Sequence, residues 1–181
     1  MRNVVTGCIV LLTMAATAFA AEPTQPPKEL TLDLGKGVKL ELILIPSGEF
    51  LMGSPDSDED ADAQEKLQHR VRITRPFYLG KYLVTQEQWE TVMGNNPSEF
   101  KGPKNPVESV SWDDCQQFFD KLNKRQGNPV GKFVLPSEAQ WEYACRAGSK
   151  TRYCFGDDEK MKSNWANMGG TIRTRTARPI L

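Results

Sequence analysis

The sequence of 181 residues predicts an α+β domain with much irregular backbone. The candidate elements run hairpin, strand, helix, loop, helix, strand, helix, without the regular β–α alternation of a parallel α/β sheet. Twelve prolines and 14 glycines indicate many turns and loops. A hydrophobic fraction of 39% and a charged fraction of 25% are typical of a globular domain that has a core of its own.

Residues 1–20 have the layout of a secretory signal peptide. Arg2 gives a positively charged start, residues 4–18 are uncharged and mostly apolar, and Ala18-Phe19-Ala20 forms an A-x-A cleavage site. The apolar run is shorter than the roughly 20 residues that a membrane span needs. We therefore expect cleavage after Ala20, export to the periplasm or the cell exterior, and no stable membrane anchor in the mature protein.

Strands are predicted in the first part of the mature chain. Residues 21–37 are expected to be a linker and N-terminal extension, because their proline-rich start lacks a core of its own. Val38–Pro46 alternates and then becomes apolar, and a turn at Ser47-Gly48 would pair it with Glu49–Met52 as a β-hairpin. One or two further strands are predicted within His69–Leu83.

Three helices are predicted, each with a capping residue at its start and a glycine at its end, over residues 85–94, 111–127 and 137–148. The second helix has one apolar face, formed by Trp112, Cys115, Phe118, Phe119 and Leu122. On that face Cys115 is expected to be a core residue and not a reactive thiol. A short strand is predicted at Phe133–Leu135, before the third helix.

Charge and chemistry exclude several functions. Lys plus Arg equals Asp plus Glu at 23 each, which argues against binding to nucleic acid or to an anionic lipid surface. The single histidine, His69, excludes a His-rich metal site and is expected on the surface. Glu138 and Glu142 lie on one helical face, where capping and dipole roles are expected in place of acid–base catalysis. Neither a P-loop nor a C-x-x-C motif is present.

Three cysteines remain after removal of residues 1–20, namely Cys115, Cys145 and Cys154. Disulfides persist in the oxidising compartments that exported proteins enter. Because the number is odd, at least one of the three has no partner in this chain. The pairing stays open at this point.

Several short motifs within residues 42–168 follow one another in the same order as the motifs of one known protein family. They are IPSGEFLMGSP at 45–55, PFYLG at 76–80, VTQEQW at 84–89, NPVESVSWDD at 105–114, LPSEAQWEYACRAG at 135–148, FGD at 155–157 and WAN at 165–167. Together they resemble the formylglycine-generating enzyme family, also called sulfatase-modifying factors. The resemblance implies a C-type-lectin-like, loop-rich α+β fold. It implies a partial domain over residues 38–170 and a divergent basic tail at 171–181, with the C-terminal half incomplete.

The resemblance also implies a chemistry. Enzymes of the family oxidise a cysteine of a client sulfatase to formylglycine, with copper held by two cysteines near the C-terminus; soft thiolates suit this metal. The segments that carry this pair have no counterpart here, so we expect an inactive chain without a cofactor of its own, whereas full-length family enzymes bind copper and calcium. The partner implied is a sulfatase or another exported protein. The alternative is a non-catalytic C-type-lectin-like binding module.

Two residues are implied as remnants of a calcium site. In the family the asparagine that corresponds to Asn167 offers its side-chain oxygen, and the next residue, here Met168, offers its carbonyl. Where further ligands are expected, this chain has arginines, which repel calcium. We therefore expect weak calcium binding or none. The resemblance also implies that Cys145 is a structural disulfide cysteine whose partner lies in the half without a counterpart.

Overall fold

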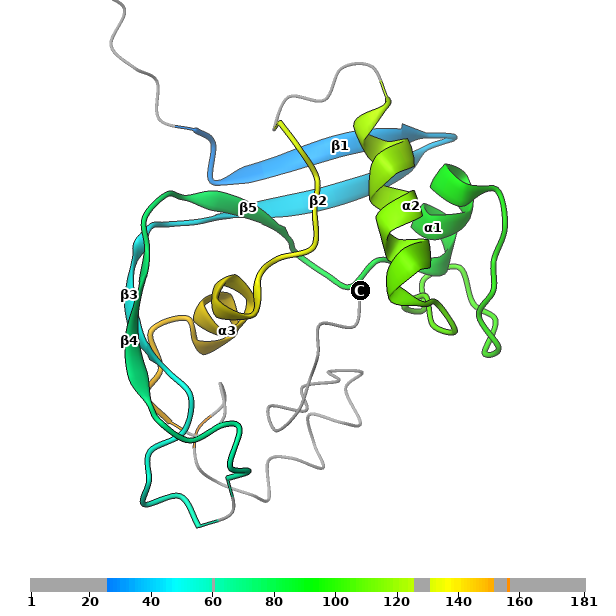
Figure 1. The fold of residues 1–181 in the computed structure, drawn as a ribbon. Coiled ribbons are helices and arrows are strands. Elements are labelled where there is room, and N and C mark those ends of the chain that lie inside the picture. The colour runs from blue at the N-terminus through cyan, green and yellow to red at the C-terminus, as the bar shows by residue number, and fades with distance from the viewer. Residues whose placement is uncertain (1–25, 60, 126–130, 152–155, 157–181) are drawn as a thin grey trace, which may run out of the picture.

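The computed structural model describes residues 26–59, 61–125, 131–151 and 156, and in this part it is an α+β fold. Figure 1 shows a long antiparallel sheet, a second small sheet that meets it at a corner, and the helices α1, α2 and α3. The predicted fold class is confirmed. No helix in these described ranges has the length and apolar character to cross a bilayer. The predicted signal peptide at 1–20 lies outside the described residues.

The long sheet has the order β1-β2-β5, with β1 at Glu29–Gly35, β2 at Val38–Ile45 and β5 at Phe77–Gly80. Both pairings are antiparallel, with Leu32 opposite Leu40 and Leu42 opposite Gly80. β1 lies within residues 21–37, so this extension contributes a strand. Its alternating leucines explain the pairing, because every second side chain of a strand points to the same face.

The small sheet consists of β3 (Gly48–Met52) and β4 (His69–Ile73), paired antiparallel with Phe50 opposite Val71. The predicted hairpin between Val38–Pro46 and Glu49–Met52 is therefore wrong. Pro46 follows β2 directly and has no N–H for a ladder bond, and the chain turns a corner there instead of reversing (Figure 1). The predicted region His69–Leu83 does contain two strands, and each joins a different sheet.

The starts of the three helices agree with prediction. They are α1 (Gln86–Met93), α2 (Trp112–Asn123) and α3 (Glu138–Arg146), with N-caps Thr85, Ser111 and Ser137. In each helix the cap hydroxyl accepts from the third backbone N–H, and the third side chain accepts from the cap's own N–H. This reciprocal capping box satisfies two amide groups that would otherwise have no partner at the helix start.

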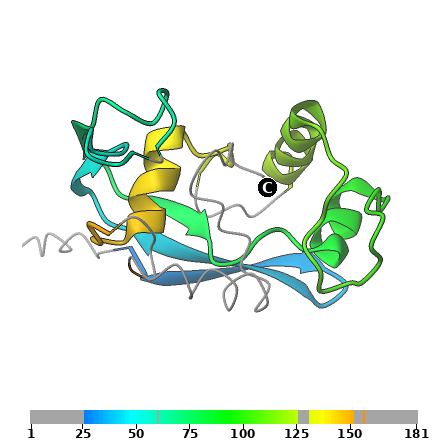
Figure 2. The ribbon, with the colours of Figure 1, turned by 90° about the horizontal axis from the view of Figure 1, so that it is seen from below.

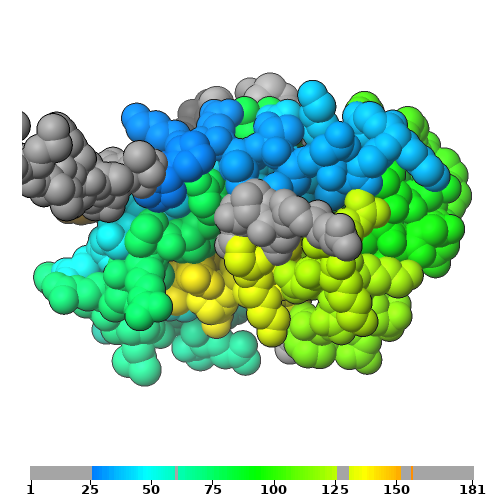
Figure 3. Space-filling model, turned by 90° about the horizontal axis from the view of Figure 1, so that it is seen from above, coloured from blue at the N-terminus to red at the C-terminus, as the bar shows by residue number. Residues whose placement is uncertain are grey.

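The end of α2 differs from prediction, as does the expected strand at Phe133–Leu135. α2 ends at Asn123 with Lys124 as its C-cap, before Gly127. The Asn123 amide then binds the Phe133 backbone in both directions, donating to its carbonyl at 2.8 Å and accepting from its N–H at 2.7 Å. These bonds take the place of a strand ladder, and residues 131–137 lie on the surface between α2 and α3 (Figure 3).

The core lies between β1, β2, α1 and α2. Trp89 and Phe118 stack with ring centroids 5.1 Å apart and planes 4° from parallel, and both are 1% exposed. The apolar face predicted for α2 is confirmed at Cys115, Phe118 and Leu122, which are all buried. Trp112, at the first position of the helix, is instead 65% exposed. Figure 2 shows α1 and α2 at one end of the molecule and α3 at the other.

Phe118→Ala tests this core. We expect the free energy of unfolding in urea to fall by about 3–5 kcal/mol, because the change removes a fully buried ring and leaves a cavity against Trp89. The matched control is Phe100→Ala, at a site that is 73% exposed, where the change should stay within about 0.5 kcal/mol. Similar losses in the two variants would contradict the assignment of the core.

Candidate functional site

Two regions outside the core hold polar side chains in fixed positions. One is a groove beside α3, and the other is residues 94–108, between α1 and α2, which we call the anchored loop. The implied calcium ligands Asn167 and Met168 lie outside the described residues, as does Cys154, and weak calcium binding stays a prediction.

The groove depends on a clamp between α3 and Gly53. One carboxylate oxygen of Glu142 accepts from the Gly53 N–H at 2.9 Å and pairs with the Arg146 guanidinium at 2.7 Å. Arg146 in turn donates to the Gly53 carbonyl at 3.1 Å. Gly53 has φ +88°, and a Cβ there would lie 2.8 Å from the Glu65 carbonyl oxygen, so only glycine fits. Glu142 thus has a structural role, but it is a tertiary contact to the loop after β3 and not the capping or dipole role expected from the sequence, since Ser137 and Gln140 form the capping box of α3.

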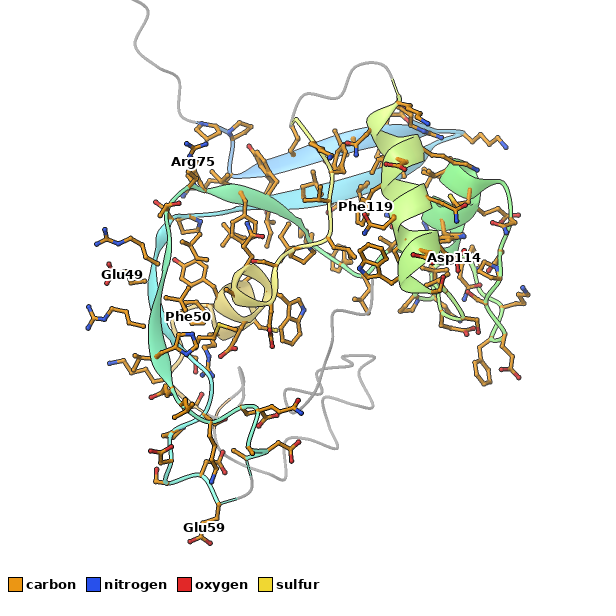
Figure 4. All side chains as sticks on the ribbon, viewed as in Figure 1. Glu49, Phe50, Glu59, Arg75, Asp114 and Phe119 are labelled. Carbon is orange, nitrogen blue, oxygen red and sulfur yellow. The ribbon has the colours of Figure 1, made fainter. Side chains whose placement is uncertain are left out.

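The groove itself has a volume of about 840 Å³ between β3, the loop after it and the C-terminal end of α3. Phe50 and Tyr143 form an aromatic wall with centroids 5.4 Å apart. Figure 4 shows Phe50 pointing toward α3 and its neighbour Glu49 pointing away from the molecule. The hydrogen bond from Arg72, followed by the charge of that residue, lowers the pKa of the Glu49 carboxyl.

The groove offers binding groups more than catalytic ones. Arg146 and Lys150 bring positive charge to its lining, and Asp58 brings negative charge. Glu49 and Arg70 also line the groove, but their charged groups pair with each other on the outer face of the strands. His69 is exposed beside it, and its Nδ1 lies 3.0 Å from the Leu67 carbonyl oxygen. In the described ranges no three His, Cys, Asp or Glu side chains are grouped to hold a metal ion.

Gln86 is the first anchor of the loop, and it is only 1% exposed. Its amide nitrogen donates to the carbonyls of Phe100 at 2.9 Å and Pro106 at 3.3 Å. Its amide oxygen accepts from the Asn96 side chain and from the Gly102 N–H, both at 3.0 Å. Since a side-chain amide has two donor hydrogens and one oxygen with two lone pairs, all of its hydrogen-bonding capacity is used within the loop.

Glu108 is the second anchor. One carboxylate oxygen accepts from the backbone N–H groups of Glu99 and Phe100, the latter at 3.0 Å, and the other accepts from the Ser109 hydroxyl at 2.6 Å. The buried Ser98 hydroxyl accepts from the Glu108 N–H at 3.1 Å and donates to the Glu108 carbonyl at 3.3 Å. The Ser109 hydroxyl, followed by the two backbone amides, lowers the pKa of Glu108.

Neither Gln86 nor Glu108 was predicted from the sequence to be a functional residue. Polar residues of this kind have no periodic pattern, and hydrophobic periodicity is the main signal that sequence reasoning uses. Only their positions in the sequence could have indicated these residues. Gln86 directly follows a helix cap, and Glu108 lies between the apolar residues Val107 and Val110. A polar side chain that is buried at such a position needs hydrogen-bond partners.

Comparison with known proteins gives a match over most of the chain. Residues 35–179 match the family model described as the sulfatase-modifying factor enzyme 1-like domain.

Individual relatives are similar over shorter shares. The chaperone protein LppX of Paenibacillus barcinonensis is 35% identical over 106 residues, which cover 42% of this chain and 38% of that protein. The formylglycine-generating enzyme of Streptomyces coelicolor is 38% identical over 175 residues, which cover 68% of this chain and 52% of the enzyme. Among solved structures, Treponema denticola variable protein 1 has a TM-score of 0.65 at 26% identity, covering 77% of this chain and 64% of that one. The chain thus spans about half the length of the enzyme.

Gln86→Leu tests the first anchor. The change keeps the volume of the side chain and removes all four hydrogen bonds of the amide, so loop groups lose partners at about 1–3 kcal/mol each when buried. We expect the free energy of unfolding to fall by at least about 3 kcal/mol. Gln117→Leu, at an exposed position of α2, is the control and should change little. A tolerated Gln86→Leu would show that the loop does not depend on this amide.

Glu108→Gln tests the second anchor through pH. The folded pKa of Glu108 lies below the unfolded value of about 4.3, so the ionised carboxylate stabilises the fold at neutral pH. This contribution is lost as pH falls through the folded pKa. We expect the variant to have a lower thermal midpoint at pH 7 and to converge with the wild type in acid. A difference in thermal midpoint between variant and wild type that stays constant from pH 7 to pH 3 would contradict this role of the charge.

Proposed function

The chain belongs to the family of the sulfatase-modifying factor enzyme 1-like domain, and we propose that it is an exported member that binds a client polypeptide without oxidising it. The match over residues 35–179 is the observation that carries this proposal, because a sulfatase-modifying factor is by its name a protein that acts on another protein. A chaperone protein among the relatives points to the same class of partner. Export rests on the predicted signal peptide at 1–20.

The described cysteines do not fit the copper pair that the resemblance implies. Burial, followed by the nearby Asp114 charge, raises the pKa of Cys115 to about 11, so this thiol is protonated at neutral pH. Copper in such a site needs thiolates. Cys115 lies on α2 and Cys145 on α3, and Figure 2 shows these two helices at opposite ends of the molecule. These two residues therefore do not form a copper site together.

The geometry favours binding over catalysis. The anchored loop has no regular secondary structure, yet side chains from α1 and from the segment before α2 fix its backbone. The clamp on Gly53 does the same for the loop after β3. Loops held on a rigid scaffold are the usual means by which such folds present binding surfaces. This geometry therefore supports a non-catalytic C-type-lectin-like binding module.

An activity assay and a binding assay together test the proposal. The purified mature chain is incubated with copper and a sulfatase-derived cysteine peptide, beside the Streptomyces coelicolor enzyme as positive control. We expect no loss of the peptide thiol to an aldehyde. In parallel, we expect saturable binding of a stably unfolded polypeptide, reduced and carboxymethylated lactalbumin, by fluorescence anisotropy. Aldehyde formation would contradict the non-catalytic part, and failure to bind the unfolded chain would contradict the client-binding part.

A further inference from the structure

We propose that Phe100 is the residue through which this chain contacts an apolar segment of its client polypeptide. This inference rests on the proposed function. The Phe100 side chain is 73% exposed, although its backbone is among the best-held parts of the loop. Its N–H donates to Glu108 at 3.0 Å, and its carbonyl accepts from the buried Gln86 amide at 2.9 Å. An exposed ring is thus attached to a backbone that side chains bind through both its N–H and its carbonyl.

Exposure alone does not mark a contact residue, because single exposed hydrophobic residues are common on protein surfaces. Leu67 illustrates this point, since it is more exposed, at 80%. The bond to its backbone comes from an exposed side chain, since the Leu67 carbonyl oxygen lies 3.0 Å from Nδ1 of the exposed His69 ring. Phe100 differs because a buried amide and a carboxylate hold its backbone on both sides.

This arrangement lowers the cost of binding. A contact residue whose backbone is already ordered loses less conformational entropy on association. A large aromatic side chain supplies apolar area, and aromatic residues are enriched among the few positions that dominate interface energies. The hydrogen bonds of Gln86 and Glu108 therefore preorganise the loop for a contact made by the ring.

The surroundings of the ring indicate a polypeptide partner. Glu99 and Lys101 flank Phe100 in the sequence, and Lys104, which follows in the same loop, forms an ion pair with Glu87. Lys101 donates to the Asn96 carbonyl at 2.9 Å. Charges of both signs around an apolar centre match the polar rim of protein interfaces. Nucleic acid or an anionic membrane would instead favour a surface of one positive sign.

Three variants of the full chain test the proposal, with carboxymethylated lactalbumin as the probe in fluorescence anisotropy. Phe100→Ala should weaken binding at least about tenfold, the loss expected when a dominant contact is truncated. Phe100→Trp keeps an aromatic ring and should bind within about threefold of the wild type. Leu67→Ala is the matched control for loss of an exposed apolar side chain and should bind like the wild type. Equal thermal midpoints confirm that every variant is folded.

The possible outcomes separate the inference from the function on which it rests. Unchanged binding by Phe100→Ala, while the wild type binds the probe, overturns the inference and leaves the proposed function standing. A wild type that does not bind the probe overturns both. Vesicles of phosphatidylcholine and phosphatidylglycerol serve as a second probe. If Phe100→Ala abolishes vesicle binding and leaves binding to the polypeptide intact, the surface is a lipid site and the proposal is wrong.

Discussion

The structure of the anchored loop depends on one constraint, which is that buried backbone groups need hydrogen-bond partners even where no strand or helix supplies them. Residues 94–108 leave α1 through Gly94, which has φ +87°, and reach α2 without regular structure. Gln86, in the first turn of α1, and Glu108, at the end of the loop, supply the missing partners. Each bond adds only about 1 kcal/mol, but a buried group left without a partner costs more. The two side chains thus stabilise an irregular backbone conformation.

Side chains also bind backbone groups at the junctions between other helices and strands. Glu142 and Arg146 bind both backbone groups of Gly53 and thereby attach α3 to the end of β3. Arg125, just after α2, donates to the carbonyls of Leu34 and Thr91, the latter at 3.0 Å, and joins α2 to β1 and α1. A fold that depends on side-chain bonds of this kind can keep long loops in fixed positions. That property suits a protein whose proposed role is to bind another polypeptide.

Sequence reasoning predicted this fold where the signals are local. The three capping boxes are such signals, because the cap and its partner are three residues apart, and every predicted helix start was confirmed. Strand pairing is not local: β3 was assigned to its neighbour β2, whereas it pairs with β4 across a long loop. Gln86 and Glu108 were missed because the loop groups that they bind lie 8 to 20 residues away from them. The implied residues Asn167 and Met168 lie outside the described part of the chain, so they stay predictions.

Hydrogen exchange of individual amides tests the central claim most directly. The Phe100 and Gly102 amides donate to the side-chain oxygens of Glu108 and Gln86 and not to a backbone ladder. If these side chains hold the loop, both amides should exchange slowly, at rates like that of the Trp89 amide inside α1. In Gln86→Leu the protection of both loop amides should be lost, whereas that of the Trp89 amide should fall only as far as the global free energy of unfolding falls. Exchange of the Phe100 and Gly102 amides at the rate of an unstructured peptide in the wild-type chain would contradict the account.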